Sequence, residues 1–279
     1  GTYLECQDMF RENGIFRDCY IISQSEKYVE DFLFRPKKNS DGTYDLKIKV
    51  NGCFDTVSVK ADGLFETELK NGEESIIPSL NVKEWNAEIP VVYEVNLSIA
   101  ENEYIRTYIG FKDIKVDGEV FLFNSKPIKT LGVNHHDTHM TKGYAMSIDD
   151  LELDVKLMKE YNCNTVRTSH YPPDPVFLTM CDMYGLYVVD EADIETHGVA
   201  CEPHNNFNLI SHDLAWAPRY LDRVKRMYLR DRSRAGIIMW SLGNEASYGK
   251  AFIKGHKYIK RRDNTRPVHY ESVYPADKK

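Results

Sequence analysis

Residues 237–245, IIMWSLGNE, show how the C-terminal half of this 279-residue chain is built. An apolar run of strand length ends at Gly243 and is followed directly by two polar residues, Asn244 and Glu245. Four further segments have the same character: residues 128–134, 164–168, 186–190 and 267–270. Stretches with helical spacing of apolar residues separate these segments. Strands that alternate with helices in this way predict a parallel sheet with right-handed crossovers.

The helices between these strands carry residues typical of helix N-caps and C-caps. Ser147 and Asp150 form a capping-box pattern, with Leu151, Val155 and Met158 on one face. The second helix is predicted to start at the N-cap Asp174, followed by Pro175, and to end before Gly185. We expect a third helix from Pro218, with Leu221, Val224 and Tyr228 inward, and a fourth over residues 248–262.

The size of this half leaves two architectures open. About 160 residues carry four complete strand–helix units and a fifth strand, whereas a closed eight-stranded barrel needs about 250. A doubly wound nucleotide-binding sheet is not favoured, because histidines rather than a glycine-rich turn follow the first strand. The half is therefore either a small open sheet or a barrel cut near its middle.

The preceding half has a different pattern. From about Tyr20 to Phe111, short alternating strands recur roughly every ten residues, at 45–50, 56–60, 91–99 and 104–109, with turn residues between them. This pattern predicts an all-β sandwich of about 90 residues. The first 18 residues fit neither half.

Composition excludes several classes of function. A formal net charge of −7 argues against a nucleic-acid partner or an anionic membrane surface. No apolar run approaches the ~18 residues of a membrane span, and no export signal is visible. The six cysteines form no CxxC pairs, so we expect reduced thiols and a cytoplasmic location.

Polar residues gather where the predicted parallel strands end, and such strand ends meet at one rim of the sheet. They are His135, His136, Asp137 and His139, then Arg167, Ser169 and His170, then Asp190, Glu191, Asp193, Glu195 and His197, then Trp240, Asn244 and Glu245, and finally His269, Tyr270 and Glu271. Arg167 is also a candidate for a structural ion pair with Asp190 or Glu191. Five polar strand ends in succession predict a functional site.

Two chemistries fit these residues. Glu195, His197 and Glu245 offer two carboxylates and an imidazole, which suits Mg²⁺ or Mn²⁺ better than zinc. Glu245, in a partly apolar pocket beside Trp240, is expected to have a raised pKa and to protonate a leaving oxygen.

The motifs resemble those of the family 2 glycoside hydrolases, most of all the bacterial-type β-galactosidases. The motifs that carry the resemblance are GVNHHD at residues 132–137, RTSHYP at 167–172, VDEADIETHG at 189–198 and WSLGNE at 240–245. Residues 3–18 look like the end of that family's N-terminal jelly-roll domain. The resemblance implies three parts: residues 1–18 as the tail of the jelly-roll domain, 19–113 as an immunoglobulin-like β-sandwich, and 114–279 as the N-terminal half of a (β/α)₈ TIM barrel.

The resemblance also implies residue roles. Glu245 would be the general acid/base, and Asn244 would hold the sugar 2-hydroxyl. His136 and His170 would bind galactose hydroxyls, and Arg167 would support the site from beneath. The Mg²⁺ ligands would be Glu195, His197 and Glu245, while Asp8 would reach the sugar and a Na⁺ site. The expected reaction is retaining hydrolysis of terminal β-D-galactose from substrates such as lactose, by a full-length protein that forms a homo-oligomer.

The chain departs from the family pattern in one essential respect. A retaining mechanism needs a second carboxylate about 5 to 5.5 Å from the first. In this family that nucleophile lies on the seventh barrel strand, whereas Glu271, on the fifth, matches nothing catalytic. We therefore expect the chain to be an interior portion of a larger enzyme, whose remainder is its partner, and to be inactive alone. Two alternatives stay open: a β-glucuronidase or β-mannosidase of the same family, and a non-catalytic carbohydrate-binding protein.

Overall fold

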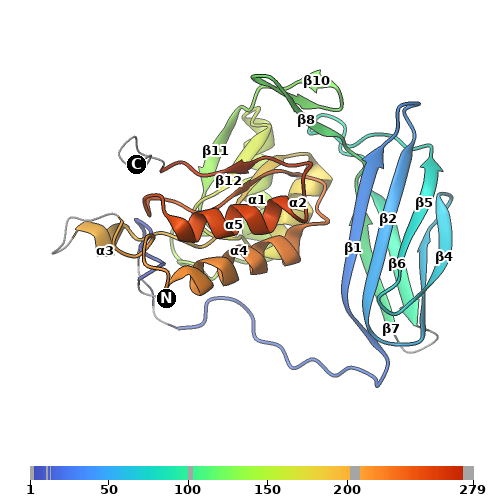
Figure 1. Cartoon of the computed structure of the whole chain (residues 1–279), viewed down its shortest axis with the longest axis horizontal. Helices are drawn as coiled ribbons and strands as arrows, with labels where there is room; N and C mark the ends of the chain where they lie inside the picture. Colours follow the sequence, from blue (N-terminus) through green and yellow to red (C-terminus); the bar gives the residue numbers. More distant parts are fainter. Residues whose placement is uncertain (1–2, 11, 13, 100–102, 202–207, 273–279) are drawn as a thin grey trace.

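The computed structural model describes residues 3–10, 12, 14–99, 103–201 and 208–272. Figure 1 shows two units side by side, one built of antiparallel strands and the other of a parallel sheet covered by helices. The hydrophobic residues of each unit form a core of its own.

The antiparallel unit consists of two sheets, of strand order β1-β2-β5 and β4-β3-β6-β7. Strand β2 shows why they stack: Tyr44, Leu46, Ile48 and Val50 alternate along it and are fully buried between the sheets. The strands are β1 (Tyr28–Lys38), β2 (Tyr44–Cys53), β3 (Thr56–Ala61), β4 (Phe65–Lys70), β5 (Glu74–Leu80), β6 (Tyr93–Ile99) and β7 (Glu103–Ile109).

The predicted β-sandwich is therefore present, and its predicted strands correspond to β2, β3, β6 and β7. Strands β1, β4 and β5 were not predicted, because charged residues or a proline interrupt the alternation along them. The first strand begins at Tyr28, later than the expected start near Tyr20. The immunoglobulin-like classification and the predicted domain bounds stay predictions.

A small sheet and a shared core connect the two units. The sheet contains β8 (Ile114–Asp117), β9 (Val120–Phe123) and β10 (Lys126–Pro127). Between the units, Trp85 is fully buried against Phe123 and Tyr187, and its indole Nε1 donates to the carbonyl oxygen of Asp182 at 2.7 Å. Lys112 donates to the carbonyl oxygens of Arg234, Ala235 and Ile237. Because these contacts are buried and specific, they hold the units together.

The second unit contains the predicted parallel sheet, with its five strands in chain order. They are β11 (Gly132–His135), β12 (Thr165–Thr168), β13 (Tyr187–Glu191), β14 (Ile237–Ser241) and β15 (Val268–His269). In the part of the chain that the structure describes, β11 and β15 are the two edges and the sheet does not close on itself. Sequential parallel order with helices outside is the arrangement of the first half of a barrel.

The helices of this unit are α1 (Ile148–Glu160), α2 (Pro175–Tyr184), α3 (His197–Cys201), α4 (Ala217–Asp231) and α5 (Lys250–Lys260). The capping box of Ser147 and Asp150 and the N-cap Asp174 are both confirmed. One inward position was wrong: on α4, Tyr220 is buried, whereas Leu221 is only partly covered. Helix α5 is shorter at both ends than the expected 248–262.

The N-terminal segment lies along the parallel unit before it crosses to β1 (Figure 1). Glu5 pairs with Glu195 as a parallel β-bridge. The Cys6 amide donates to the Glu195 carbonyl oxygen at 3.1 Å, and the Glu195 amide donates to the Leu4 carbonyl oxygen at 2.7 Å. This pairing brings the residues that follow Cys6 to the carboxyl end of β13.

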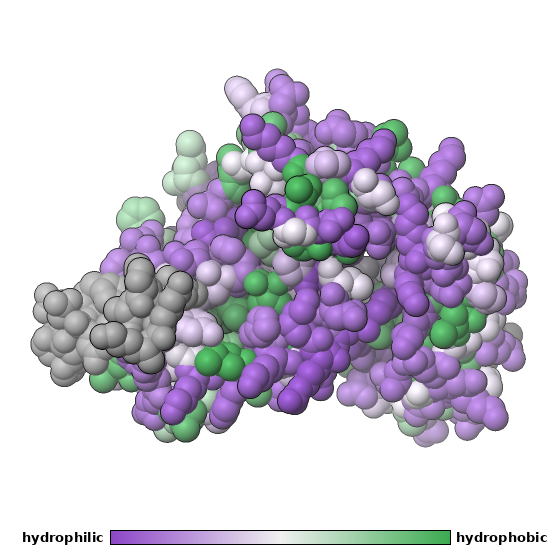
Figure 2. All heavy atoms as spheres, turned by 45° about the horizontal axis from the view of Figure 1, so that its top comes forward, coloured by the Kyte–Doolittle hydropathy of each residue, from purple (hydrophilic) through white to green (hydrophobic). Residues whose placement is uncertain are grey.

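Neither a spanning helix nor a disulfide bond is found among the residues that the structure describes. No helix among the described residues combines the length and the apolar character needed to cross a bilayer. Figure 2 shows hydrophobic side chains as separate patches among hydrophilic ones on the face it presents. Cys6, Cys19, Cys53, Cys163 and Cys181 form no disulfide bond.

Candidate active site

The predicted site residues meet at the carboxyl ends of the parallel strands. Arg167 lies in β12 and His170 just after it, while Glu191 ends β13. Glu195 and His197 follow β13, and Asn244 and Glu245 follow β14. Hydrogen bonds and close contacts between side chains join all of these residues into one group, so the prediction that strand ends converge on one rim is confirmed.

Glu191 is the buried centre of this group. Arg167 donates to Glu191 through Nε at 2.8 Å and through Nη2 at 2.9 Å. Of the two ion-pair partners considered for Arg167, Glu191 is the one observed. Asp190 lies on the opposite face of β13, because successive strand residues alternate.

Asn244 connects Arg167 of β12 with Glu195, which follows β13. Its Oδ1 accepts from Arg167 Nη2 at 3.0 Å, and its Nδ2 donates to Glu195 Oε2 at 2.9 Å. These two bonds fix which end of the amide is oxygen. The backbone N–H of Asn244 also donates to the Ile194 carbonyl oxygen at 2.8 Å. Both the side chain and the backbone of Asn244 are therefore fixed by hydrogen bonds.

The turn into Asn244 depends on a glycine. Gly243 has a φ of +138°, and a Cβ added there would lie 2.6 Å from the Ile194 carbonyl oxygen. Only glycine allows this backbone and this approach at once. Gly243 therefore lets the β14 loop contact the segment that carries Glu195.

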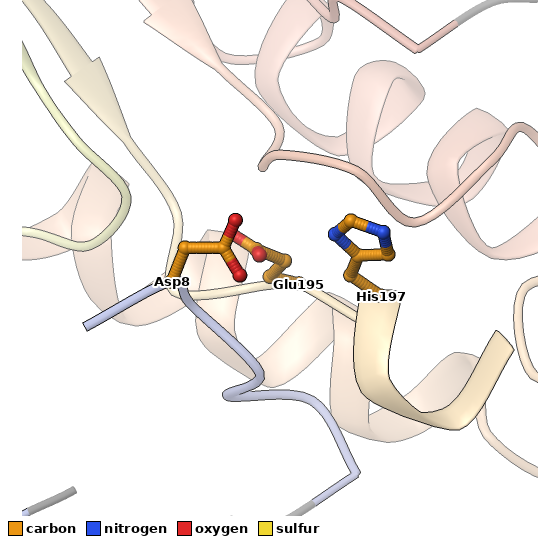
Figure 3. A group of neighbouring side chains, drawn as sticks. All are labelled: Asp8, Glu195 and His197. Carbon is orange, nitrogen blue, oxygen red and sulfur yellow. The ribbon is translucent and has the colours of Figure 1, made fainter. Parts of the chain in front are cut away.

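Asp8, Glu195 and His197 form a group with the composition of a metal site (Figure 3). One ligand atom from each lies within 4.8 Å of the others. Two carboxylate oxygens and one imidazole nitrogen are a donor set suited to Mg²⁺ or Mn²⁺. Glu245, which the sequence analysis placed among the ligands, contacts this group through His197, with Oε2 2.5 Å from Nδ1.

The pKa values of the buried carboxyl groups of Glu195 and Glu191 are shifted in opposite directions. Burial raises the pKa of Glu195, and the charges of Glu245 and Asp8 act in the same direction, although the Asn244 amide opposes them. A bound cation would remove this repulsion, which supports the fit of the group to a metal ion. Burial also acts to raise the pKa of Glu191, but hydrogen bonds from His170 and Arg167 outweigh it and hold that pKa below its ordinary value.

The two histidines expected to bind sugar hydroxyls lie side by side, just after the carboxyl ends of β11 and β12. The rings of His136 and His170 meet edge to face with centroids 5.5 Å apart, and His136 also contacts Tyr171. Burial, with the neighbouring His170 next, lowers the pKa of His136. At neutral pH this imidazole is therefore uncharged, and one of its nitrogens can accept a hydrogen bond.

Trp240 is not where the sequence analysis placed it. Its ring packs against Tyr228 of α4, and its Nε1 donates to Asp263 Oδ2 at 3.0 Å. The next residue along β14, Ser241, points to the opposite face and donates to Glu191. The prediction that Glu245 lies in a partly apolar pocket beside Trp240 was therefore wrong, because strand alternation directs Trp240 toward the helices. Glu245 itself is 40% exposed.

Three polar residues of the site were missed or given no role. Gln7 Nε2 donates to Asp193 Oδ1 at 2.8 Å and to the His170 carbonyl oxygen at 3.3 Å. Ser241 is a polar residue inside an apolar strand, which was the signal available for it. Glu271 Oε1 accepts from the Glu245 amide at 2.9 Å and so helps to hold the loop.

Comparison with known proteins finds relatives that match the whole chain. The model of the TIM barrel domain of glycosyl hydrolases family 2 matches residues 114–279. The β-galactosidase of Staphylococcus xylosus is 36% identical over 292 residues, covering 100% of this chain and 29% of that protein. The β-galactosidase of Streptococcus thermophilus is 34% identical over 297 residues, covering 98% of this chain and 29% of that protein. The chain thus spans less than a third of the length of these relatives.

Solved structures share the fold at lower identity. The β-D-glucuronidase of Dictyoglomus thermophilum superposes with a TM-score of 0.74 at 24% identity, covering 88% of this chain and 44% of that one. A β-galacturonidase of Eisenbergiella tayi superposes with a TM-score of 0.69 at 22% identity, covering 88% of this chain and 46% of that one.

The class defined by fold and site is a glycosidase barrel domain. The chain belongs to the glycosyl hydrolases family 2, which confirms the resemblance inferred from its motifs. Of the two architectures left open, the five-stranded sheet is accordingly part of a TIM barrel domain.

Proposed function

We propose that this chain supplies the acid/base side of the active site of a retaining β-galactosidase. The observation that carries the proposal is the Asn244–Glu245 pair at the end of β14, joined through Asn244 to Arg167 and Glu195 and through Glu245 to His197. The relatives at 34–36% identity are named β-galactosidases.

In the proposed reaction, Glu245 first acts as a general acid and protonates the glycosidic oxygen as the bond to the leaving group breaks. A second carboxylate, which we place in the remainder of the enzyme, attacks the anomeric carbon. Glu245, now a carboxylate, then takes a proton from the water that releases the sugar. Its exposed position at the rim leaves room for both the leaving group and the water.

The other residues would bind and orient the sugar. Asn244 would hold the 2-hydroxyl, and His136 and His170 would contact the other hydroxyls. Asp8, Glu195 and His197, with Glu245 beside them, would hold a divalent cation, and Asp8 is also the proposed contact to Na⁺. A cation there would supply fixed positive charge next to Glu245. Homo-oligomerisation of the full-length protein is part of the same proposal.

A substrate panel on the full-length product of the gene tests the sugar. We expect p-nitrophenyl β-D-galactoside to be hydrolysed with a higher kcat/KM than the corresponding glucuronide or mannoside. Preference for either of the others would transfer the assignment to that sugar. No hydrolysis of any of them would favour the carbohydrate-binding alternative.

The substitution Glu245→Gln tests the residue. We expect kcat to fall by about 10²–10⁴-fold, because an amide cannot transfer the proton. Glu160→Gln, an exposed change at the end of α1, is the matched control and should leave kcat unchanged. Unchanged activity of Glu245→Gln would remove Glu245 from the mechanism.

A further inference from the structure

Protein side chains occupy all the hydrogen-bond acceptor positions of the Glu191 carboxylate. Its side chain is 0% exposed. Oε1 accepts from Arg167 Nη2 at 2.9 Å and is 2.6 Å from His170 Nδ1. Oε2 accepts from Arg167 Nε at 2.8 Å and from Ser241 Oγ at 2.5 Å. A carboxylate has about four lone-pair positions, so these four contacts leave none for a sugar, a water molecule or a cation.

The charge of Glu191 determines what His170 can do. Because its hydrogen-bond donors hold the pKa of Glu191 below the ordinary value, the group is a carboxylate at neutral pH. A carboxylate only accepts hydrogen bonds, so His170 Nδ1 must carry a proton. In the neutral imidazole, Nε2 then has its lone pair free for the hydrogen of a sugar hydroxyl.

Glu191 also acts on Asn244 through Arg167. The two bonds from Arg167 to Glu191 fix the plane of the guanidinium, since a two-point contact allows a single orientation. From that plane, Nη2 donates to Asn244 Oδ1 at 3.0 Å. This leaves Asn244 Nδ2 directed at Glu195 Oε2, 2.9 Å away.

We propose that Glu191 is a positioning residue for the sugar site: it sets the tautomer of His170 and the plane of Arg167, and through Arg167 it fixes Asn244. The inference rests on the proposed function, because it assigns His170 and Asn244 to sugar hydroxyls. Glu191 does not touch the sugar. Its effect is transmitted on one side by an imidazole and on the other by a guanidinium and an amide.

Glu191→Gln in the full-length gene product is the first test. Either orientation of the new amide places its NH₂ against an N–H group of Arg167, so the two-point contact is lost in both. We expect kcat to fall about 100-fold, the usual consequence of a small misplacement of binding groups, while KM changes by less than about threefold. Glu152→Gln, which removes the negative charge of a glutamate on α1 that contacts Tyr184 and Lys156, is the matched control and should leave both constants unchanged.

A double substitution separates positioning from general structural support. If Glu191 acts partly through His170, then Glu191→Gln should cost much less in a His170→Asn background than in the wild type. The same full loss in both backgrounds would overturn the part of the proposal that concerns His170. A loss below about twofold in the wild type would overturn the whole proposal, since a site whose binding groups depend on the Glu191 carboxylate cannot tolerate its neutralisation.

Nuclear magnetic resonance of ¹⁵N-labelled histidine gives a readout that needs no activity. We expect His170 to be in the Nδ1-protonated tautomer in the wild type and to change its Nδ1 signal in Glu191→Gln, with assignment by loss of the signal in His170→Asn. An Nε2-protonated His170 in the wild type would overturn the inference. If the substrate panel shows no hydrolysis while this tautomer is found, the proposed function fails and the role of Glu191 in setting His170 stands.

Discussion

Replacing Gly243 with alanine tests how closely the β14 loop must approach the Glu195 segment. The new Cβ would lie 2.6 Å from the Ile194 carbonyl oxygen and 2.9 Å from the Ile194 Cβ, neither of which is the end of a flexible side chain. A side chain at a φ of +138° costs about 1–3 kcal/mol. Displacing the backbone to relieve the overlap costs about 1–3 kcal/mol more. We therefore expect Gly243→Ala to lower the free energy of unfolding by about 2–6 kcal/mol.

The matched control is Gly63→Ala in the turn between β3 and β4. Gly63 also has a positive φ, of +71°, but an added Cβ there meets nothing within 4 Å. Its cost should be that of the left-handed backbone alone, about 1–2 kcal/mol. Urea unfolding of the full-length gene product, followed by tryptophan fluorescence, measures both variants.

A second readout follows the site. Displacement of the Gly243 backbone should move Asn244 away from Glu195, so we expect kcat for the galactoside to fall in Gly243→Ala and to stay unchanged in Gly63→Ala. Equal unfolding free energies for the two variants would refute the reasoning, because they would show that the close contact with Ile194 carries no cost.

Two further predictions concern buried carboxylates. Burial, together with the Asp231 carboxylate, raises the pKa of Asp190 well above its ordinary value, so as the pH rises above about 4 the unfolded chain ionises this group before the folded protein does. Stability conferred by the protonated form is thus lost as pH rises, and Asp190→Asn, which cannot ionise, should gain stability relative to the wild type by up to about 1.4 kcal/mol per pH unit over the range in which only the unfolded chain has ionised. Urea unfolding at a series of pH values above about 4 measures this, and a pH-independent difference would contradict it. For the proposed metal site, equilibrium dialysis should show Mg²⁺ binding that weakens at least about tenfold in Glu195→Gln and stays unchanged in Glu152→Gln, since affinity depends on the number of charged ligands. Equal binding by wild type and Glu195→Gln would place any Mg²⁺ elsewhere.

Much of the parallel unit could be predicted from the sequence because its signals are local. Ser147 with Asp150 and Asp174 with Pro175 mark helix starts within a few residues, and apolar runs such as residues 237–241 mark buried strands. Polar residues in the last part of such runs or beyond their ends placed Arg167, Glu195 and Asn244 at one rim. The weaker strands β4 and β5 carry glutamates and a proline, which hide the alternation from local analysis.

What the sequence could not settle depended on contacts between distant residues. Strand alternation predicts that Asp190 and Glu191 face opposite ways, but which of them faces the site depends on where α4 lies, because its Asp231 interacts with Asp190. The same uncertainty led to the wrong placement of Trp240, which packs on α4. Gln7 was missed because its partners His170 and Asp193 are 163 and 186 positions away.

The distance along the chain between Glu5 and Glu195 has a consequence for how the protein is made. During synthesis, the Glu5 segment leaves the ribosome long before Glu195 and cannot form their β-bridge until Glu195 has been translated. Closing a loop that encloses the whole antiparallel unit and three parallel strands costs about 4–5 kcal/mol in chain entropy. We therefore expect the N-terminal segment to dock late, after the two cores have formed. Asp8 would then be the last of the three residues of the proposed metal site to take its place, so the nascent polypeptide would complete that site only after both cores had formed.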